Sequence, residues 1–494
     1  MRYLLLGSFL LLFLAGPSNS LFSQRLMTLE QSVEEALKQS PDIVRARLNQ
    51  ERYHELLIAQ KASLKSRFKL DLSPFSYQNQ RSYQDYAQEW YNTQKLQSFG
   101  NFNVSQPIIW TDGTLTLNNR FGWEDNKSST TDNPFTGFSN SLDLRLDQPI
   151  FTYNRRKLEY KEIEFNFENS QLNYSLQALN VEKQITQYFY QIYQKQMELI
   201  TSREEWNNRK KSYEIIKNKV DAGLTAKEEM LQAELDMMSS QSTVQNNETE
   251  LENIKDNFKQ MLGLPFTEEL MVIAEVSVLP IDIDLGMAVN FAIANRMEIR
   301  QREIDIETGQ FELIRTNATN EFKGNVSVAV GLFGNDKNLN NIYDAHNRND
   351  NQDVRVSFEV PLWDWGEKKA RMRAAEASLQ TSEYNLEDEK KSIRLGIRQI
   401  ERNLRNMLIQ IQIARKNEEN AQLTYEINLE KYRNGDLTSM DLNLVQNQLT
   451  QKKNALTNSL INYKLELLNM KLQTLYDFEN QRSIMPDVNA YETK

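Results

Sequence analysis

Cysteine is absent from the 494 residues, and histidine occurs only twice, at His54 and His346. The two histidines stand in unrelated contexts, and each is expected to be an ordinary surface residue. These absences argue against zinc sites built from cysteine and histidine, against thiol nucleophiles and against histidine-dependent catalytic triads. No glycine-rich phosphate-binding loop is present either. We therefore expect no enzymatic activity, no bound metal and no cofactor.

Glycine and proline are scarce, with 16 and 10 copies. Their scarcity predicts long elements joined by few turns. Charged residues make up 26% of the chain and the mean hydropathy is −0.65, so these elements are expected to be solvated over much of their surface. The net charge of −10 arises from acidic and basic residues that are interspersed. Without a cluster of Lys and Arg, a nucleic-acid partner is not expected.

Long apolar runs are missing except at the start of the sequence. Residues 1–20 have the features of a signal peptide, with Arg2 in a basic region, an apolar stretch at 3–15 and small residues at 18–20. Export is therefore expected. No later window reaches the ~18 to 20 apolar residues that a membrane-spanning helix requires. Because the absence of cysteine also removes a lipoprotein anchor, a place in a membrane would require β-strands.

An internal repeat is the clearest pattern in the sequence. Residues 142–157 match residues 354–369, and this offset of 212 residues then holds without a gap for more than eighty residues. Nearer the start of each half, residues 28–48 match residues 284–304 at an offset of 256. The two offsets differ by 44, so the first half carries 44 extra residues between about residue 75 and residue 141. The sequence therefore predicts a tandem duplication.

Each half is predicted to contain a helix, a pair of strands and a very long helical stretch that is interrupted once. In the second long stretch, apolar residues recur at alternating steps of four and three, the heptad pattern of a coiled coil: Ile393, Ile397, Ile400, Leu404, Met407, Ile411 and Ala414. The counterpart in the first half is Val181, Ile185, Tyr188 and Ile192. The interruption reads KYRNGDLTSMDL at 431–442, where Gly435 is expected to end one helix in a left-handed cap and Thr438 to start the next.

Strict alternation of apolar and polar residues predicts strands around 142–146 and 354–360, with partners around 68–72 and 326–332. Such strands fit either a soluble sheet or a transmembrane barrel. Aromatic residues near the strand ends favour the barrel, because they collect at membrane interfaces: Trp110, Trp123, Phe151, Trp363 and Trp365.

The extra residues of the first half include a predicted β-hairpin at 102–123. We interpret it as a surface-exposed extension rather than an additional strand pair in the barrel wall, because unequal halves would spoil the repeat. The polar segment 334–353 is expected to be the corresponding outer loop of the second half. Residues 125–133 could suggest a calcium site, but a solvated loop is the preferred interpretation.

The order, spacing and duplication of these motifs resemble the TolC family of outer-membrane efflux proteins, also called outer membrane factors. The resemblance rests on QPIF at 148–151 and VPLW at 360–363, on the interrupted helices at 219–235 and 431–449, and on QMLGLP at 260–265. It covers nearly the whole chain after the signal peptide.

The resemblance implies a mainly α fold with a transmembrane β-barrel, in which three chains with four strands each close a 12-strand barrel above a long periplasmic coiled-coil barrel of helices. Closure by three chains is physically sensible, because four strands alone leave two open edges that lipid cannot satisfy. The expected segments are a signal peptide at 1–20, a first structural repeat at 21–265, a connector in the periplasmic equatorial region at 266–283, a second repeat at 284–478 and a polar C-terminal tail at 479–494.

The implied function is a passive outer-membrane channel of a tripartite efflux or type I secretion system in a Gram-negative bacterium, with a large periplasmic portion. The implied partners are two further copies in a homotrimer, a periplasmic membrane-fusion adaptor, an inner-membrane transporter and outer-membrane lipid. The alternative from another class is an exported trimeric coiled-coil adhesin or scaffold with a soluble β-head.

The resemblance also implies a gate at the helix tip, formed by Tyr432, Asp441 and Glu229. Three copies of Asp441 would make an acidic collar that attracts cations. Two positions depart from the family pattern, because Leu437 stands where the gate arginine is expected and Leu444 where a second aspartate is expected. Arg433 is a candidate substitute for the arginine. The turns at the tip, which the resemblance assigns to adaptor contact, contain Gly223, Leu224, Gly435 and Leu437.

Two gate residues also have a local interpretation. Asp441 lies three residues after Thr438, the spacing of a helix capping box, so its carboxylate could serve the helix start. Glu229 lies in an acidic first turn that a solvated helix start explains equally well.

Overall fold

The computed structural model describes residues 25–85, 88–128, 134–274, 276–278, 280–344, 346, 348–434 and 436–484. The expected signal peptide at 1–20, the expected cap residue Gly435 and residues 485–494 of the expected tail lie outside the described residues. The chain forms two compact units. The helical unit contains Gln177–Ala288, Gly396–Met485 and the segment that ends at Arg45, and the sheet unit contains Ala46–Leu176 and Val289–Leu395.

The helices confirm the tandem duplication element by element. Those of the first repeat are α1 (Leu29–Gln39), α2 (Pro41–Ser63), α3 (Arg155–Asp221) and α4 (Lys227–Leu262). Those of the second are α5 (Leu285–Asn295), α6 (Met297–Asn317), α7 (Glu367–Asn434) and α8 (Ser439–Thr474). Each helix starts at the offset that the sequence repeat predicts.

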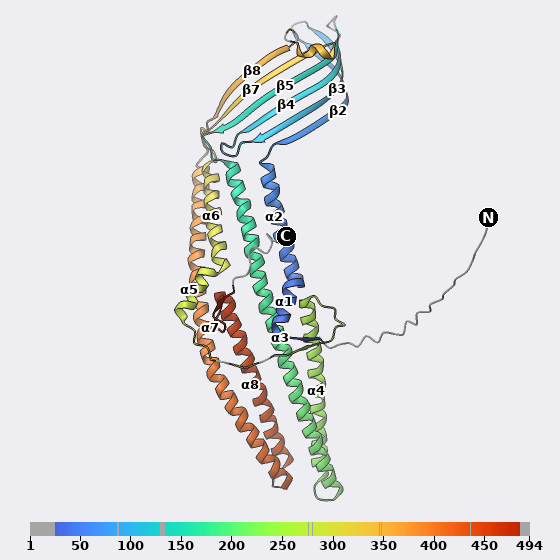
Figure 1. Cartoon of the computed structure of the whole chain (residues 1–494), viewed down its shortest axis with the longest axis vertical. Helices are drawn as coiled ribbons and strands as arrows, with labels where there is room; N and C mark the ends of the chain where they lie inside the picture. The colour runs from blue at the N-terminus through green and yellow to red at the C-terminus, as the bar shows by residue number, and fades with distance from the viewer. Residues whose placement is uncertain are drawn as a thin grey trace, which may run out of the picture. The chain divides into compact units, whose positions relative to one another are not determined.

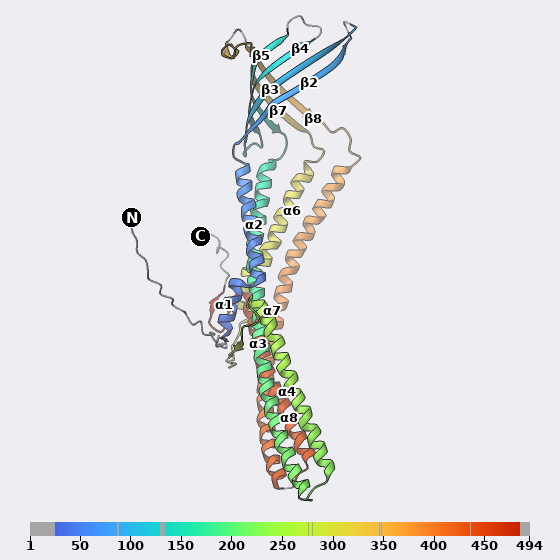
Figure 2. The same cartoon turned by 90° about the vertical axis from the view of Figure 1, so that its right-hand side faces the viewer.

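The predicted heptad seams form much of the helical core. On α3, Val181, Ile185 and Ile192 are fully buried. On α7 the buried seam residues are Ile393, Ile397, Ile400, Leu404 and Ile411. Apolar residues at heptad spacing share one face of a helix, and packing that face against a neighbour removes them from water. Figure 2 shows α4 running back beside α3 within the helical unit.

A six-stranded antiparallel sheet dominates the sheet unit, in the order β2, β3, β4, β5, β7, β8 (Figure 1). The strands are β2 (Arg67–Gln84), β3 (Glu89–Pro107), β4 (Thr114–Ser128), β5 (Phe135–Ile150), β7 (Lys323–Asp336) and β8 (Arg348–Glu359). The pair β5 and β7 joins the two repeats, with Leu144 opposite Val330.

Two predictions about this sheet are corrected by the structure. The sheet has six strands per chain rather than four, so three copies would not give a 12-strand barrel. The hairpin at 102–123 is formed by β3 and β4, and it lies between β2 and β5 inside the sheet rather than on an extension. The prediction assumed equal halves, but an antiparallel sheet accepts an additional pair of strands without disturbing the alternation of strand directions.

The two polar segments expected to be loops, 334–353 and 125–133, are partly strand, which corrects both expectations, because strands pair through their backbones whatever the polarity of their side chains. The segment 334–353 contains the ends of β7 and β8 and a 3-10 helix, η1 (Leu339–Tyr343). Residues 125–128 belong to β4, and residues 129–133 lie outside the described part of the chain.

Two small sheets lie in the helical unit. In the connector between the repeats, β6 (Leu270–Val272) pairs in parallel with β1 (Arg25–Met27). Near the end of the described chain, β9 (Tyr476–Asp477) pairs with β10 (Arg482–Ser483), so the first residues of the expected tail are folded. None of the described helices contains a stretch that is long and apolar enough to cross a membrane.

Candidate functional site

The turn between α3 and α4, at the counterpart of the predicted Gly435 cap, is a Schellman motif. The Leu224 N–H donates to the Lys219 carbonyl over 2.8 Å, and the Gly223 N–H donates to the Val220 carbonyl over 2.9 Å. Gly223 has a φ of +71°, a conformation that is strained for any residue with a Cβ. This turn ends α3 and lets α4 fold back along it.

One hydrogen bond of this pattern recurs between α7 and α8. The Asp436 N–H donates to the Lys431 carbonyl over 2.9 Å, which is the counterpart of the bond between Leu224 and Lys219. Thr438 caps α8, because its hydroxyl oxygen accepts from the Asp441 N–H over 3.2 Å. The hydroxyl also donates to the Asp441 carboxylate over 2.7 Å. The local interpretation of Asp441 as part of a helix cap is therefore supported.

Tyr432 lies in the core of the tip, with only 5% of its surface exposed. The Lys219 ammonium lies 5.5 Å from the centre of its ring. Among the described residues the buried Tyr432 hydroxyl has no hydrogen-bond partner. Burial raises the pKa of Tyr432, and the negative charge of Glu229 raises it further. Glu229 thus acts on Tyr432 through its field, and no hydrogen bond joins them.

A polar cluster that the sequence reasoning missed lies beside Tyr432. The Arg209 guanidinium of α3 donates to the Asn447 side-chain oxygen of α8 over 2.6 Å and pairs with Glu205 on its own helix over 2.7 Å. It lies 3.9 Å from Asp236 of α4, whose carboxylate accepts from the Asn443 side chain of α8 over 2.7 Å. We call Arg209, Glu205, Asp236, Asn443 and Asn447 the tip cluster. It connects the helices of the first repeat to α8 of the second.

The tip cluster encloses little free space. A cavity of about 10 Å³ lies among Arg209, Asp236, Asn443 and Tyr432. This is close to the smallest volume that holds one water molecule. The Arg209 side chain is only 10% exposed, so its charge depends on these partners rather than on solvent.

The sequence contains a pattern that could have identified Arg209 as a site residue. Ser202, Arg209 and Ile216 stand seven residues apart, and both Ser202 and Ile216 are buried on the heptad seam of α3. Arg209 is therefore a charged residue at a seam position, and Glu205 precedes it by one helical turn. A charge at such a position needs a buried partner, and the search for one would have pointed to this interface.

The other predicted tip residues lie on the surface. Asp441 and Glu229 are exposed, and Leu437 is half-buried. Leu224 and Leu444 are exposed apolar residues, at 77% and 58%. The structure brings Tyr432 next to the tip cluster, but it does not join Asp441 or Glu229 to that cluster by a hydrogen bond.

Four of the five predicted interface aromatics follow a strand end. Trp110 comes after β3, Phe151 after β5, and Trp363 and Trp365 after β8, and all four are exposed. Trp363 and Trp365 pack edge to face with ring centres 5.6 Å apart. Trp123 instead lies within β4, which corrects the expectation that it marks a strand end, because β4 continues for five residues beyond it.

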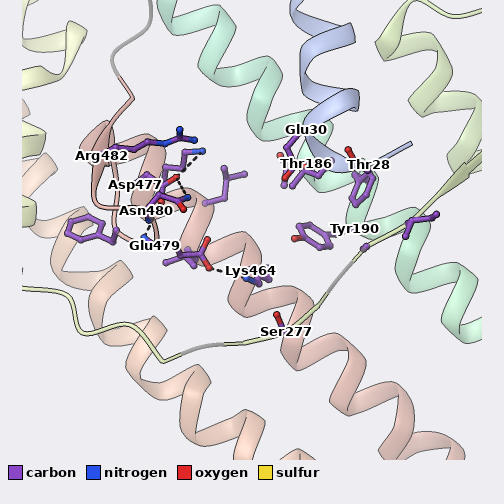
Figure 3. Close-up of a pocket in the computed structure, with 18 residues that line it drawn as sticks. Thr28, Glu30, Thr186, Tyr190, Ser277, Lys464, Asp477, Glu479, Asn480 and Arg482 are labelled. Carbon is purple, nitrogen blue, oxygen red and sulfur yellow. Dashed lines mark hydrogen bonds and ion pairs between the residues drawn. The ribbon is translucent and has the colours of Figure 1, made fainter. Parts of the chain in front are cut away.

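A larger cavity of about 640 Å³ lies in the helical unit between α3, α8 and the β9–β10 hairpin (Figure 3). Lys464 of α8 pairs with Glu479 of the hairpin over 3.0 Å. Burial, together with the charges of Glu479 and Glu30, raises the pKa of Tyr190 to about 12. These contacts hold the hairpin against α8, and we assign the lining a structural role.

Comparisons with known proteins agree with this architecture. A sequence model of the family described as outer membrane efflux protein matches residues 114–264 and 318–471, together more than half of the chain. A comparison with the sequences of curated proteins finds no match.

Three solved structures illustrate the similarity of fold. The CmeC outer membrane channel of Campylobacter jejuni is 15% identical, with a TM-score of 0.68 over 93% of this chain and 87% of CmeC. The outer membrane protein VceC of Vibrio cholerae is 13% identical, with a TM-score of 0.66 over 91% of this chain and 95% of VceC. The MtrE outer membrane channel of Neisseria gonorrhoeae, solved in an open state, is 12% identical, with a TM-score of 0.64 over 93% of this chain and 91% of MtrE.

Identities this low establish the fold alone, whereas the sequence match establishes the family. The alternative of an adhesin or scaffold is thereby set aside. The chain belongs to the outer membrane efflux protein family, as its resemblance to the TolC family predicted, and it is an outer-membrane channel of tripartite efflux systems rather than an enzyme.

Proposed function

We propose that this channel is a passive conduit that works as a homotrimer in the outer membrane. It receives its cargo from an inner-membrane transporter through a periplasmic adaptor. The proposal extends to type I secretion, since a wet passage places few demands on the chemistry of the cargo. Delivery to the outer membrane depends on export by the signal peptide at 1–20, and the helices form a large periplasmic portion.

In this proposal the tip of the helices is the gate, and the contacts of the tip cluster hold the gate closed. Opening of the passage requires α7 and α8 to move away from α3 and α4. Such a movement separates Arg209 from Asn447, and Asp236 from Asn443. Because removing one partner of a buried charge is costly, the closed state is favoured until adaptor contact offsets this cost.

The exposed residues of the tip are assigned to two tasks. Leu224 and Leu437, one in each tip turn, offer apolar contacts for the adaptor. In the sequence, Gly223 directly precedes Leu224 and Gly435 stands two residues before Leu437, so we assign both glycines to the same contact. Asp441 of each copy faces the passage and forms an acidic collar that favours cations over anions.

The test measures the conductance of two arginine variants of α3 in planar lipid bilayers. Arg209→Met removes the charge that joins α3 to α8, whereas Arg203→Met removes an exposed pair with Glu248 of α4, 2.6 Å long and confined to the first repeat. We expect the wild-type trimer to conduct weakly, Arg209→Met to raise the conductance several-fold, and Arg203→Met to leave it unchanged.

Two results would overturn parts of this proposal. Equal conductance of Arg209→Met and the wild type would remove the tip cluster as a lock. A water-soluble assembly in which neither form conducts would remove the conduit itself.

A further inference from the structure

One row of paired residues shows that β3 and β4 share the apolar face of the sheet. Opposite partners on neighbouring antiparallel strands point to the same face. The row runs through Phe68 of β2, Val104 of β3, Leu117 of β4, Leu144 of β5 and Val330 of β7. The adjacent row continues it onto β8, where Val354 pairs with Val328 of β7.

The opposite face is polar on the same strands. The neighbouring row runs through Lys69, Asn103, Asn118 and Asp143. On this face the Arg120 guanidinium of β4 lies 3.9 Å from the centre of the Phe99 ring of β3. The two strands therefore have one apolar and one polar face, aligned with those of their neighbours, which is the pattern of a wall between lipid and a wet lumen.

The turn between β3 and β4 is anchored at the start of α3. The Asn154 side chain donates to the Ile109 carbonyl over 2.6 Å, and Arg156 lies 3.6 Å from the Asp112 carboxylate. The sequence QPII at 106–109 resembles QPIF at 148–151, so β3 ends with the motif that also ends β5. The turn between β3 and β4 thus lies beside the first turn of α3, which follows the end of β5.

An even number of added strands preserves closure of the wall. The six strands alternate in direction, so the two edge strands, β2 and β8, run antiparallel to each other. The β8 edge of one copy can therefore pair with the β2 edge of the next copy in the antiparallel sense used throughout the sheet.

We propose that β3 and β4 are part of the lipid-facing wall, so that three copies close an eighteen-strand barrel. This rests on the proposed homotrimer and on the six strands of each chain. Barrel diameter grows roughly linearly with strand number, so the lumen at the sheet is about 1.5 times as wide as in a twelve-strand barrel. The lining of this wider lumen includes Asn103, Asn118 and Arg120.

The test uses the absence of native cysteine, which makes every introduced thiol unique. Leu117→Cys and Asn118→Cys are adjacent on β4 but lie on opposite faces. Leu144→Cys and Asp143→Cys form the matched pair on β5. Each variant is placed in lipid vesicles and treated with a charged, membrane-impermeant thiosulfonate. We expect Asn118→Cys and Asp143→Cys to react rapidly, and Leu117→Cys and Leu144→Cys to be protected at least tenfold.

The two pairs separate failure of this inference from failure of the proposed function. If the β5 pair behaves as expected but Leu117→Cys reacts as fast as Asn118→Cys, then β3 and β4 lie outside the membrane and the inference is wrong. If Leu144→Cys also reacts rapidly, the sheet does not cross a membrane and the conduit fails as well. The protein mass of the detergent-solubilised assembly, after subtraction of the bound detergent, gives the number of chains. Two chains instead of three would overturn the eighteen-strand barrel.

Discussion

The Arg209 guanidinium and the Asn447 side-chain oxygen, 2.6 Å apart, connect the first repeat to the second at the tip of the helices. Arg209 belongs to α3 and Asn447 to α8, so this hydrogen bond must break if the repeats separate. The arginine is largely buried and has Glu205 as a second partner. In the proposed gate, this satisfied charge favours the closed arrangement of the helices.

A covalent bridge within the tip cluster should hold the channel closed. The Asn443 side chain donates to the Asp236 carboxylate over 2.7 Å, so cysteines at both positions lie within reach of a short thiol crosslinker. We expect crosslinking of the double variant to lower the conductance, and a reducing agent to restore it. The single variant Asp236→Cys is the control. Unchanged conductance in channels whose crosslink is visible by gel mobility would contradict a gate at this interface.

Substitution of Tyr432 should distinguish packing from hydrogen bonding. Because the buried hydroxyl has no partner in the described structure, Tyr432→Phe should leave the free energy of unfolding unchanged or slightly increased. Tyr432→Ala should lower it by about 3 to 5 kcal/mol, as for other buried aromatic residues. Chemical denaturation measures both. A loss above about 1 kcal/mol for Tyr432→Phe would mean that the hydroxyl is bonded, for example to a water molecule in the small cavity.

Substitution by alanine should change the free energy of unfolding in opposite directions at two glycines that have free space around them. A Cβ at either Gly223 or Gly396 meets no atom within 4 Å. Gly223 has a φ of +71°, so Gly223→Ala should destabilise the tip by about 1 to 2 kcal/mol. Gly396 lies within α7, so Gly396→Ala should stabilise the helix by about 1 kcal/mol. Thermal unfolding monitored by circular dichroism tests the signs, and equal signs would refute the conformational explanation.

The β9–β10 hairpin should loosen in acid. Burial alone would raise the pKa of Asp477, but hydrogen bonds from Asn480 and Glu479 and the charge of Lys471 outweigh it and lower the pKa. A lowered folded-state pKa contributes stability above the unfolded value of about 3.9, and this contribution is lost as pH falls through the folded value. Hydrogen exchange in 476–484 should therefore be faster in Asp477→Asn than in the wild type at pH 6. The difference should shrink below about pH 4, and a constant difference would contradict this assignment.

The acidic collar predicts a change in ion selectivity without a loss of fold. Asp441→Asn removes the charge and should reduce cation selectivity, measured as the reversal potential in a salt gradient. Thr438→Val is the matched control, because it removes the helix cap, at a cost of about 1 kcal/mol, and leaves the carboxylate in place. It should lower stability but leave the reversal potential unchanged. If Asp441→Asn keeps the selectivity of the wild type, Asp441 serves only the start of α8.

Much of the helical architecture could be predicted from the sequence because its determinants are local. The heptad spacing of Ile185 and Ile192 places both on one helix face, and both are buried. The repeat placed Gly223 opposite Gly435, so the interruption between α3 and α4 could be located from the sequence. The tip cluster escaped prediction because Arg209 and Asn447 are 238 residues apart, and no local pattern specifies which surface of α8 meets α3.

The sequence by itself determined the duplication, the long helices, the tip turns and the family. Repeated motifs and periodicity depend on residues that are close together in the sequence, so they can be recognised without the fold. The tertiary structure alone decided where β3 and β4 belong. Alternation along a strand shows that it has two different faces, but not which strand lies beside it. Only the pairing of Val104 with Leu117, and of Leu117 with Leu144, placed the additional hairpin within the sheet. Strand pairing is formed by hydrogen bonds between distant segments, which is why the number of strands in the wall could not be read from either half of the repeat.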